Sequence, residues 1–70
     1  MKHHNLLKLI DDATNSDHIT TIAVSEHQAL GDTESEFRES LKRIAEAELF
    51  LQIEEVIFHP RDLFRLKWGS

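Results

Sequence analysis

The sequence predicts an α+β fold, in which two helices pack on one face of a small, mainly antiparallel three-stranded sheet. The expected order is helix, strand, helix, strand, strand. The prediction rests on a capped amphipathic pattern that begins at Thr33, a β-branched segment before it, and alternating apolar residues near the C-terminus. With 70 residues and no cysteine, the chain is expected to form one small domain over residues 1–70, without disulfides or thiolate zinc sites.

The first helix is expected from Asn5 to about Thr14. Asn5 has the side chain of an N-cap residue. Asp11 and Asp12 fall near the C-terminal end, where carboxylates oppose the helix dipole, so a short helix is expected. The apolar residues follow helical spacing: Leu6, Leu9, Ile10 and Ala13.

The segment from His18 to Ser25 is rich in β-branched residues, which favour a strand. Ile22 and Val24 alternate along it, so both side chains are expected to face the core. Asn15, Ser16 and Asp17 before it have the composition of a turn.

The second helix has the clearest pattern in the chain. Thr33 and Glu36 have the spacing of a capping box, in which each side chain satisfies a free amide at the helix start. The helix is expected to run to about Ala47. Its core-facing stripe comprises Phe37, Leu41, Ile44, Ala45 and Leu49. Two exposed ion pairs are expected, Glu34 with Arg38 and Glu39 with Arg43.

Residues 48–58 fit two patterns. The apolar positions continue the helical stripe, but Leu49, Leu51 and Ile53 also alternate as in a strand. A helix from Thr33 to Phe58 would exceed the usual ~8–20 residues and leave the other strands short of partners. We therefore favour a strand near Gln52–Phe58.

The C-terminal segment also has two interpretations. His59 to Asp62 is expected to form a turn with Pro60 at its second position. Phe64, Leu66 and Trp68 then alternate with two cations, which favours a half-exposed strand. The alternative places Pro60 in the first turn of a short helix. The last two residues, Gly69 and Ser70, are expected to fray.

The net charge of −5 is unevenly distributed along the chain. The acids concentrate between Glu26 and Glu55, which argues against broad binding of a phosphate backbone. No apolar run reaches the ~20 residues that a membrane span needs, and the N-terminus has no signal-peptide core. We therefore expect no membrane association and a cytoplasmic location.

Signatures of catalysis and of metal or cofactor binding are weak. The five histidines (His3, His4, His18, His27 and His59) lack the spacing of a metal-binding helix. The acids near Asp11 and Asp17 lack the glycine and alternating ligands of a calcium loop. No serine lies in a Gly-x-Ser-x-Gly turn, and Gly31 and Gly69 are the only glycines. We expect no enzyme activity, no cofactor and no small-molecule substrate.

The preferred function is a non-enzymatic protein–protein interaction module, a small regulatory or accessory factor acting as a homodimer or on a protein partner. One version is an inhibitor of the kind that mobile elements encode, whose acidic helix imitates a phosphate backbone. The candidate interface residues are the apolar ones near the C-terminus: Phe50, Phe58, Phe64, Leu66 and Trp68.

The alternative function is weak nucleic-acid binding by the basic, aromatic C-terminal segment. Cations beside an aromatic ring are typical of surfaces that bind single strands. The residues concerned are Arg61, Arg65, Lys67 and Trp68. A third and less favoured hypothesis is a small metal-dependent enzyme that uses the histidines.

Overall fold

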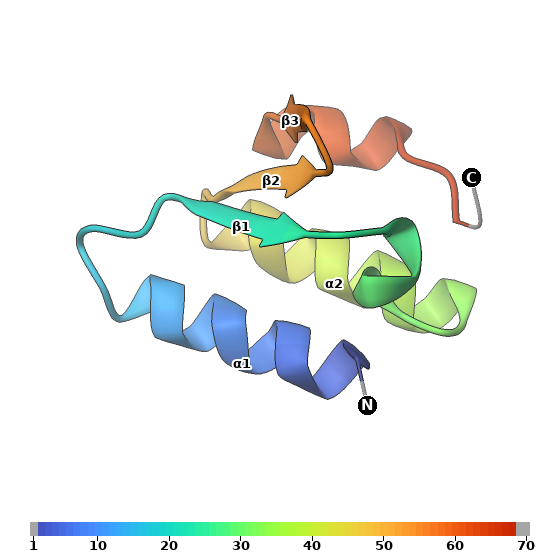
Figure 1. Ribbon diagram of the computed structural model, residues 1–70, viewed down its shortest axis with the longest axis horizontal. Coiled ribbons are helices and arrows are strands. Elements are labelled where there is room, and N and C mark those ends of the chain that lie inside the picture. Colours follow the sequence, from blue (N-terminus) through green and yellow to red (C-terminus); the bar gives the residue numbers. More distant parts are fainter. Residues whose placement is uncertain (1, 69–70) are drawn as a thin grey trace.

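The computed structural model describes the backbone of residues 2–68 and the side chains of residues 5–68. Two α-helices and a three-stranded sheet form a two-layer α+β fold (Figure 1). The elements follow one another as α1 (Lys2–Thr14), β1 (Thr21–Val24), the 3-10 helix η1 (His27–Leu30), α2 (Glu34–Glu46), β2 (Phe50–Ile53), β3 (Val56–Phe58) and the 3-10 helix η2 (Pro60–Arg65). The predicted fold class and the order of helices and strands are confirmed. Gly69 and Ser70, which were expected to fray, lie outside the described residues.

The sheet is mixed, with the strand order β1-β2-β3, and so is not mainly antiparallel as expected. Helix α2 carries the chain back between β1 and β2, so these strands are parallel, as a helical crossover dictates. A two-residue turn, Glu54–Glu55, reverses the chain between β2 and β3, which are antiparallel. Glu54 has a positive φ of 54°, which this turn imposes.

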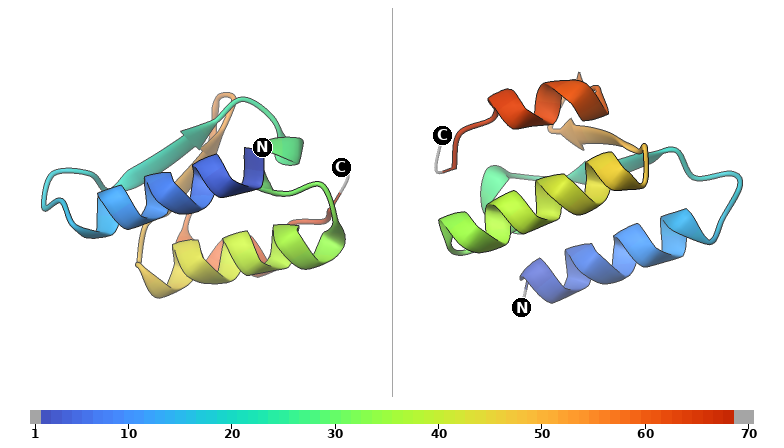
Figure 2. Two further views of the ribbon diagram at one scale, coloured as in Figure 1. Left: turned by 90° about the horizontal axis from the view of Figure 1, so that it is seen from below. Right: turned by 180° about the vertical axis from the view of Figure 1, so that it is seen from behind.

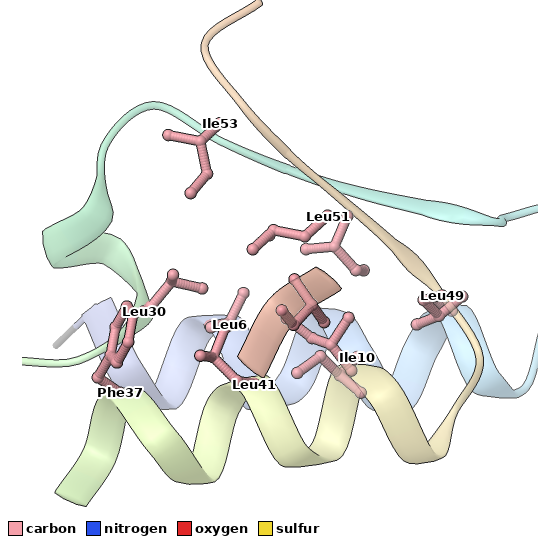
Figure 3. Close-up of a cluster of buried hydrophobic side chains, with 12 residues drawn as sticks. Leu6, Ile10, Leu30, Phe37, Leu41, Leu49, Leu51 and Ile53 are labelled. Atoms are coloured by element: carbon pink, nitrogen blue, oxygen red, sulfur yellow. The ribbon is translucent and has the colours of Figure 1, made fainter. Parts of the chain in front are cut away.

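Both α-helices cover the same face of the sheet, and η2 lies beside α2 (Figures 1 and 2). The core between the two layers contains the predicted residues Phe37, Leu41, Ile44, Leu49 and Ile22, with Val24 packed against it. Figure 3 shows how side chains from both helices and from β2 meet there. The remaining buried apolar residues are Leu6, Ile10, Ala13, Leu30, Leu51, Ile53 and Leu63.

Helix α2 begins as predicted. The Thr33 hydroxyl accepts a hydrogen bond from the Glu36 amide at 3.2 Å. The Glu36 carboxylate reaches back one residue further than expected and accepts from the Asp32 amide at 3.1 Å. The predicted ion pairs are both present: Glu34–Arg38 at 3.3 Å and Glu39–Arg43 at 3.5 Å.

The first helix starts earlier than predicted. α1 begins at Lys2, so Asn5 lies inside the helix and is not its N-cap. No proline or glycine precedes Asn5 to stop the helix there. The strand predicted over His18–Ser25 is shorter and occupies Thr21–Val24.

Two strands occupy the region where we favoured one. Helix α2 ends at Glu46, which excludes the continuous helix, and the expected strand near Gln52–Phe58 is a hairpin of β2 and β3. The helix ends without glycine because Glu48 takes the left-handed conformation, with φ 57°. The amide of Glu48 donates to the Ala45 carbonyl and that of Leu49 to the Ile44 carbonyl, which is a Schellman motif.

The C-terminal strand predicted over Phe64–Trp68 is wrong, and the alternative helix is correct. Residues 60–65 form η2, with Pro60 in its first turn. His59 caps this helix, since its Nδ1 accepts a hydrogen bond from the Arg61 amide at 3.2 Å. Leu63 is fully buried one turn after Pro60, and it anchors η2 to the core.

Candidate protein-binding surfaces

The exposed large apolar side chains concentrate in the C-terminal part of the chain. Among the residues whose side chains are described, Leu9 and Ile19 belong to the N-terminal part. The others follow α2: Phe50, Val56, Ile57, Phe64 and Trp68. Scattered exposed apolar residues are normal, but contiguous ones mark binding surfaces.

A groove lies between α2 and η2, with a volume of about 560 Å³. We call it the α2–η2 groove and define it by Arg38, Leu41, Lys42, Ala45, Glu46 and Phe64. Leu41 is buried and Ala45 half-buried, so the α2 side has an apolar base, where the small Ala45 leaves space. Phe64 projects from η2 with 69% of its surface exposed. The exposed ring and the apolar hollow beside it can together bind a complementary apolar group of another molecule.

The rim of the α2–η2 groove carries more positive than negative charge. Arg38, Lys42 and Glu46 are one turn apart on α2, so their side chains form one row along the groove. Arg38 pairs with Glu34, but both side chains are largely exposed, and such pairs hold weakly. Lys42 makes no ion pair with any residue that the structure describes.

The second apolar surface is the side of the sheet that faces away from the helices. Strand register places Thr21, Ala23, Phe50, Gln52 and Ile57 there, and we call these residues the open sheet face. Within residues 2–68, no helix packs over it (Figure 2). Ile57 is 60% exposed and Phe50 37% exposed. The His59 ring meets Phe50 edge-on, with ring centroids 5.4 Å apart.

The candidate interface residues from the sequence lie in different places. Phe64 lines the α2–η2 groove, and Phe50 belongs to the open sheet face. Phe58 and Leu66 are partly buried against the core, so their substitution would also affect folding. Trp68 follows η2 and is 47% exposed.

The candidate nucleic-acid residues lie on and just after η2. Arg61 and Arg65 belong to η2, with Asp62 between them, and Lys67 and Trp68 follow its end. The three cations are exposed. Arg61 is three residues before Phe64, so both side chains share a face of the 3-10 helix.

Sequence reasoning missed the groove because it expected a strand where η2 forms. The row Arg38, Lys42 and Glu46 borders the predicted stripe and could have been found from helical spacing. The second wall of the groove is Phe64, which lies on a helix that packs against α2. The alternating apolar residues of that segment favoured a strand there instead.

Other residues considered for chemistry have structural or exposed positions. Ser40 is fully buried, and its hydroxyl donates to the Leu30 carbonyl, which ties η1 to α2. The side chains of His3 and His4 lie outside the described residues. Among the described residues, no three His, Cys, Asp or Glu side chains gather as metal ligands would. Glu54 and Glu55 form the exposed hairpin turn.

No family model, curated protein or solved structure matches the chain. None of the helices within residues 2–68 combines the length and apolar character that crossing a membrane requires.

Proposed function

We propose that this chain is a non-enzymatic protein-interaction module, a small regulatory or accessory factor that binds its partner at the α2–η2 groove. One observation carries the proposal: Phe64 is 69% exposed beside an apolar hollow of about 560 Å³. A folding chain gains free energy by burying a phenylalanine, and Phe64 remains available for burial against another protein.

The groove has the composition of an interface centre with a charged rim. Leu41, Ala45 and Phe64 supply apolar surface, and Arg38, Lys42 and Glu46 surround it. Interfaces commonly have this arrangement, in which an aromatic anchor contributes most of the binding energy and the rim contributes specificity.

Site-specific photo-cross-linking tests this proposal. A photoreactive phenylalanine analogue replaces Phe64 in the full-length chain, expressed in the cells that naturally make it. The matched control places the analogue at Ile19, which is also exposed but is not among the groove residues. We expect a discrete protein adduct from position 64 and none from position 19. Equal adducts from both positions, or nuclease-sensitive adducts from position 64, would contradict the proposal.

We also propose self-association through the open sheet face. The supporting observation is that Phe50 pairs with Thr21 and Ile57 with Gln52 in the sheet. Both side chains nevertheless remain exposed, on a side that no described helix covers. A disulfide-free chain of this length has a small core, and a second copy would supply additional burial.

A further inference from the structure

We propose that the occupant of the α2–η2 groove is a short amphipathic helix of a partner protein, with carboxylates beside one large apolar anchor. The proposal rests on the proposed function and specifies the chemistry of the partner. It follows from the length of the groove, the shape of its base and the charge of its rim.

The length of the groove matches two turns of a helix. Its α2 side extends from Arg38 to Glu46, about 12 Å at a rise of about 1.5 Å per residue. A docked helix presents side chains at positions i, i+3 or i+4, and i+7, which span nearly the same distance. A volume of about 560 Å³ accommodates one or two large side chains of such a helix.

The shape of the base favours a large apolar anchor. Ala45 leaves a depression on α2 between bulkier neighbours, and Phe64 borders it from the η2 side. A leucine or aromatic side chain inserted there would contact Leu41 and the Phe64 ring together. Contacts of this kind remove apolar surface of both partners from water.

The charge of the rim favours carboxylates in the partner. Arg38 and Lys42 lie on the α2 rim, and Arg61 shares the face of η2 that carries Phe64. Lys42 has no ion-pair partner among the described residues. A chain with a net charge of −5 thus presents an apolar hollow whose α2 rim has two cations, Arg38 and Lys42, and one acid, Glu46. Acidic side chains flanking the anchor would complement these cations.

A nucleic acid fits the same surface less well. Binding to a phosphate backbone gains free energy from each phosphate that a cation neutralises, so a tight complex needs many cations. Here Glu46 interrupts the rim, Asp62 lies between the two arginines of η2, and the net charge repels a polyanion. The apolar base offers no hydrogen-bond donor to a phosphate.

Selection from a random peptide library tests the inference. A phage-displayed library of 16-residue peptides is selected on the immobilised full-length chain, with Phe64→Ala protein as the counter-selection. We expect a consensus in which leucine or an aromatic residue recurs at helical spacing with Asp or Glu beside it. A basic consensus, or no peptide that depends on Phe64, would overturn the proposed chemistry.

Affinity measurements with the selected peptide then identify the contacts. We expect Phe64→Ala and Lys42→Glu each to weaken binding by about tenfold or more in fluorescence anisotropy. The matched controls, Ile19→Ala and Lys8→Glu, alter an exposed apolar residue and an exposed cation outside the groove and should leave the affinity unchanged.

Two results would contradict the inference at this stage. One is equal binding of a peptide whose carboxylates are replaced by lysines. The other is tighter, Phe64-dependent binding of single-stranded oligothymidine, which would favour the nucleic-acid alternative. If the peptide experiments give either contradicting result but position 64 still yields a discrete cross-link, this inference is refuted and the proposed function is unaffected.

Discussion

Thr33 and Glu36 show how two side chains fix the start of a helix. The Thr33 hydroxyl and the Glu36 carboxylate satisfy amides of residues 36 and 32, which would otherwise lack partners. This start sets the orientation of α2, so Phe37, Leu41 and Ile44 enter the core. Leu41 also lines the base of the groove together with Ala45.

We predict that Thr33→Ala lowers the free energy of unfolding by about 0.5–2 kcal/mol, because the Glu36 amide loses its acceptor. Thr33→Ser retains a hydroxyl and should change the value by only a few tenths of a kcal/mol. Urea denaturation followed by circular dichroism measures both variants. Equal loss in the two variants would show that the hydroxyl does not cap α2.

Gly31 occupies a position with no room for a side chain. A Cβ added there would lie 2.6 Å from the Glu36 Cβ and 2.7 Å from the Phe37 backbone nitrogen. We predict that Gly31→Ala destabilises the fold by about 1–3 kcal/mol, because the first turn of α2 must move. Asp32→Ala, at the exposed neighbouring residue, is the control and should have a small effect. Denaturant unfolding measures the stability of both variants. A Gly31→Ala protein as stable as the wild type would contradict the close approach of residue 31 to the first turn of α2.

At the scale of elements, the end of α2 determines whether β2 can form. The Schellman motif turns the chain at Glu48, and Leu49 then packs in the core with Ile44. The motif usually places glycine where this chain has Glu48. A non-glycine residue in this left-handed conformation is held there at a cost of about 1–2 kcal/mol.

We therefore predict that Glu48→Gly raises the free energy of unfolding by about 1 kcal/mol. Glu46→Gly, two residues earlier and still helical, should lower it by about the same amount. Thermal or urea unfolding of the two variants compares them directly. A Glu48→Gly protein less stable than the wild type would indicate that the helix does not end in this conformation.

Most elements could be predicted from local chemistry. The capping pair, the apolar stripe and the β-branched segment identified α2 and β1, because each depends on neighbouring residues alone. The end of α2 was expected near Ala47, and the helix ends at Glu46. The Glu54–Glu55 turn was not predicted, because it places glutamate where glycine or asparagine is usual. Helix η2 was only the less favoured of two interpretations of the C-terminal segment. Phe64, Leu66 and Trp68 alternate as in a strand, but burial of Leu63 stabilises a helix instead.

The candidate site, likewise, could be predicted only where it depends on neighbouring residues. The sequence identified Phe64 as an interface candidate from its type and position. Its neighbours Lys42 and Ala45 are about twenty residues away in the chain, and the packing of η2 on α2 brings them together. Such proximity depends on tertiary structure, which spacing within one element does not reveal.

In the whole molecule, we propose separate roles for the two apolar surfaces. The open sheet face is proposed for self-association and the α2–η2 groove for a partner. A standard interface buries about 800 Å² of accessible surface on each chain. This is about a sixth of the 4986 Å² that this chain exposes. The five residues of the open sheet face supply only part of such an area. A dimer formed there should therefore dissociate on dilution.

We predict a concentration-dependent dimer in sedimentation velocity at micromolar concentrations. Ile57→Asp should shift the protein to monomer without loss of secondary structure, because it places a charge on the exposed open sheet face. Ile19→Asp, at another exposed apolar residue, should leave the dimer intact. A wild-type protein that stays monomeric over this range would refute self-association and leave the groove proposal unaffected.

An NMR titration shows whether the partner binds at the α2–η2 groove. The isotope-labelled chain is titrated with the protein identified by cross-linking, and backbone amide shifts are followed. We predict that the largest changes fall on residues 38–46 and 60–65, which carry the groove and its rim. Changes confined to α1 or to the open sheet face, with α2 and η2 unperturbed, would contradict binding at the groove.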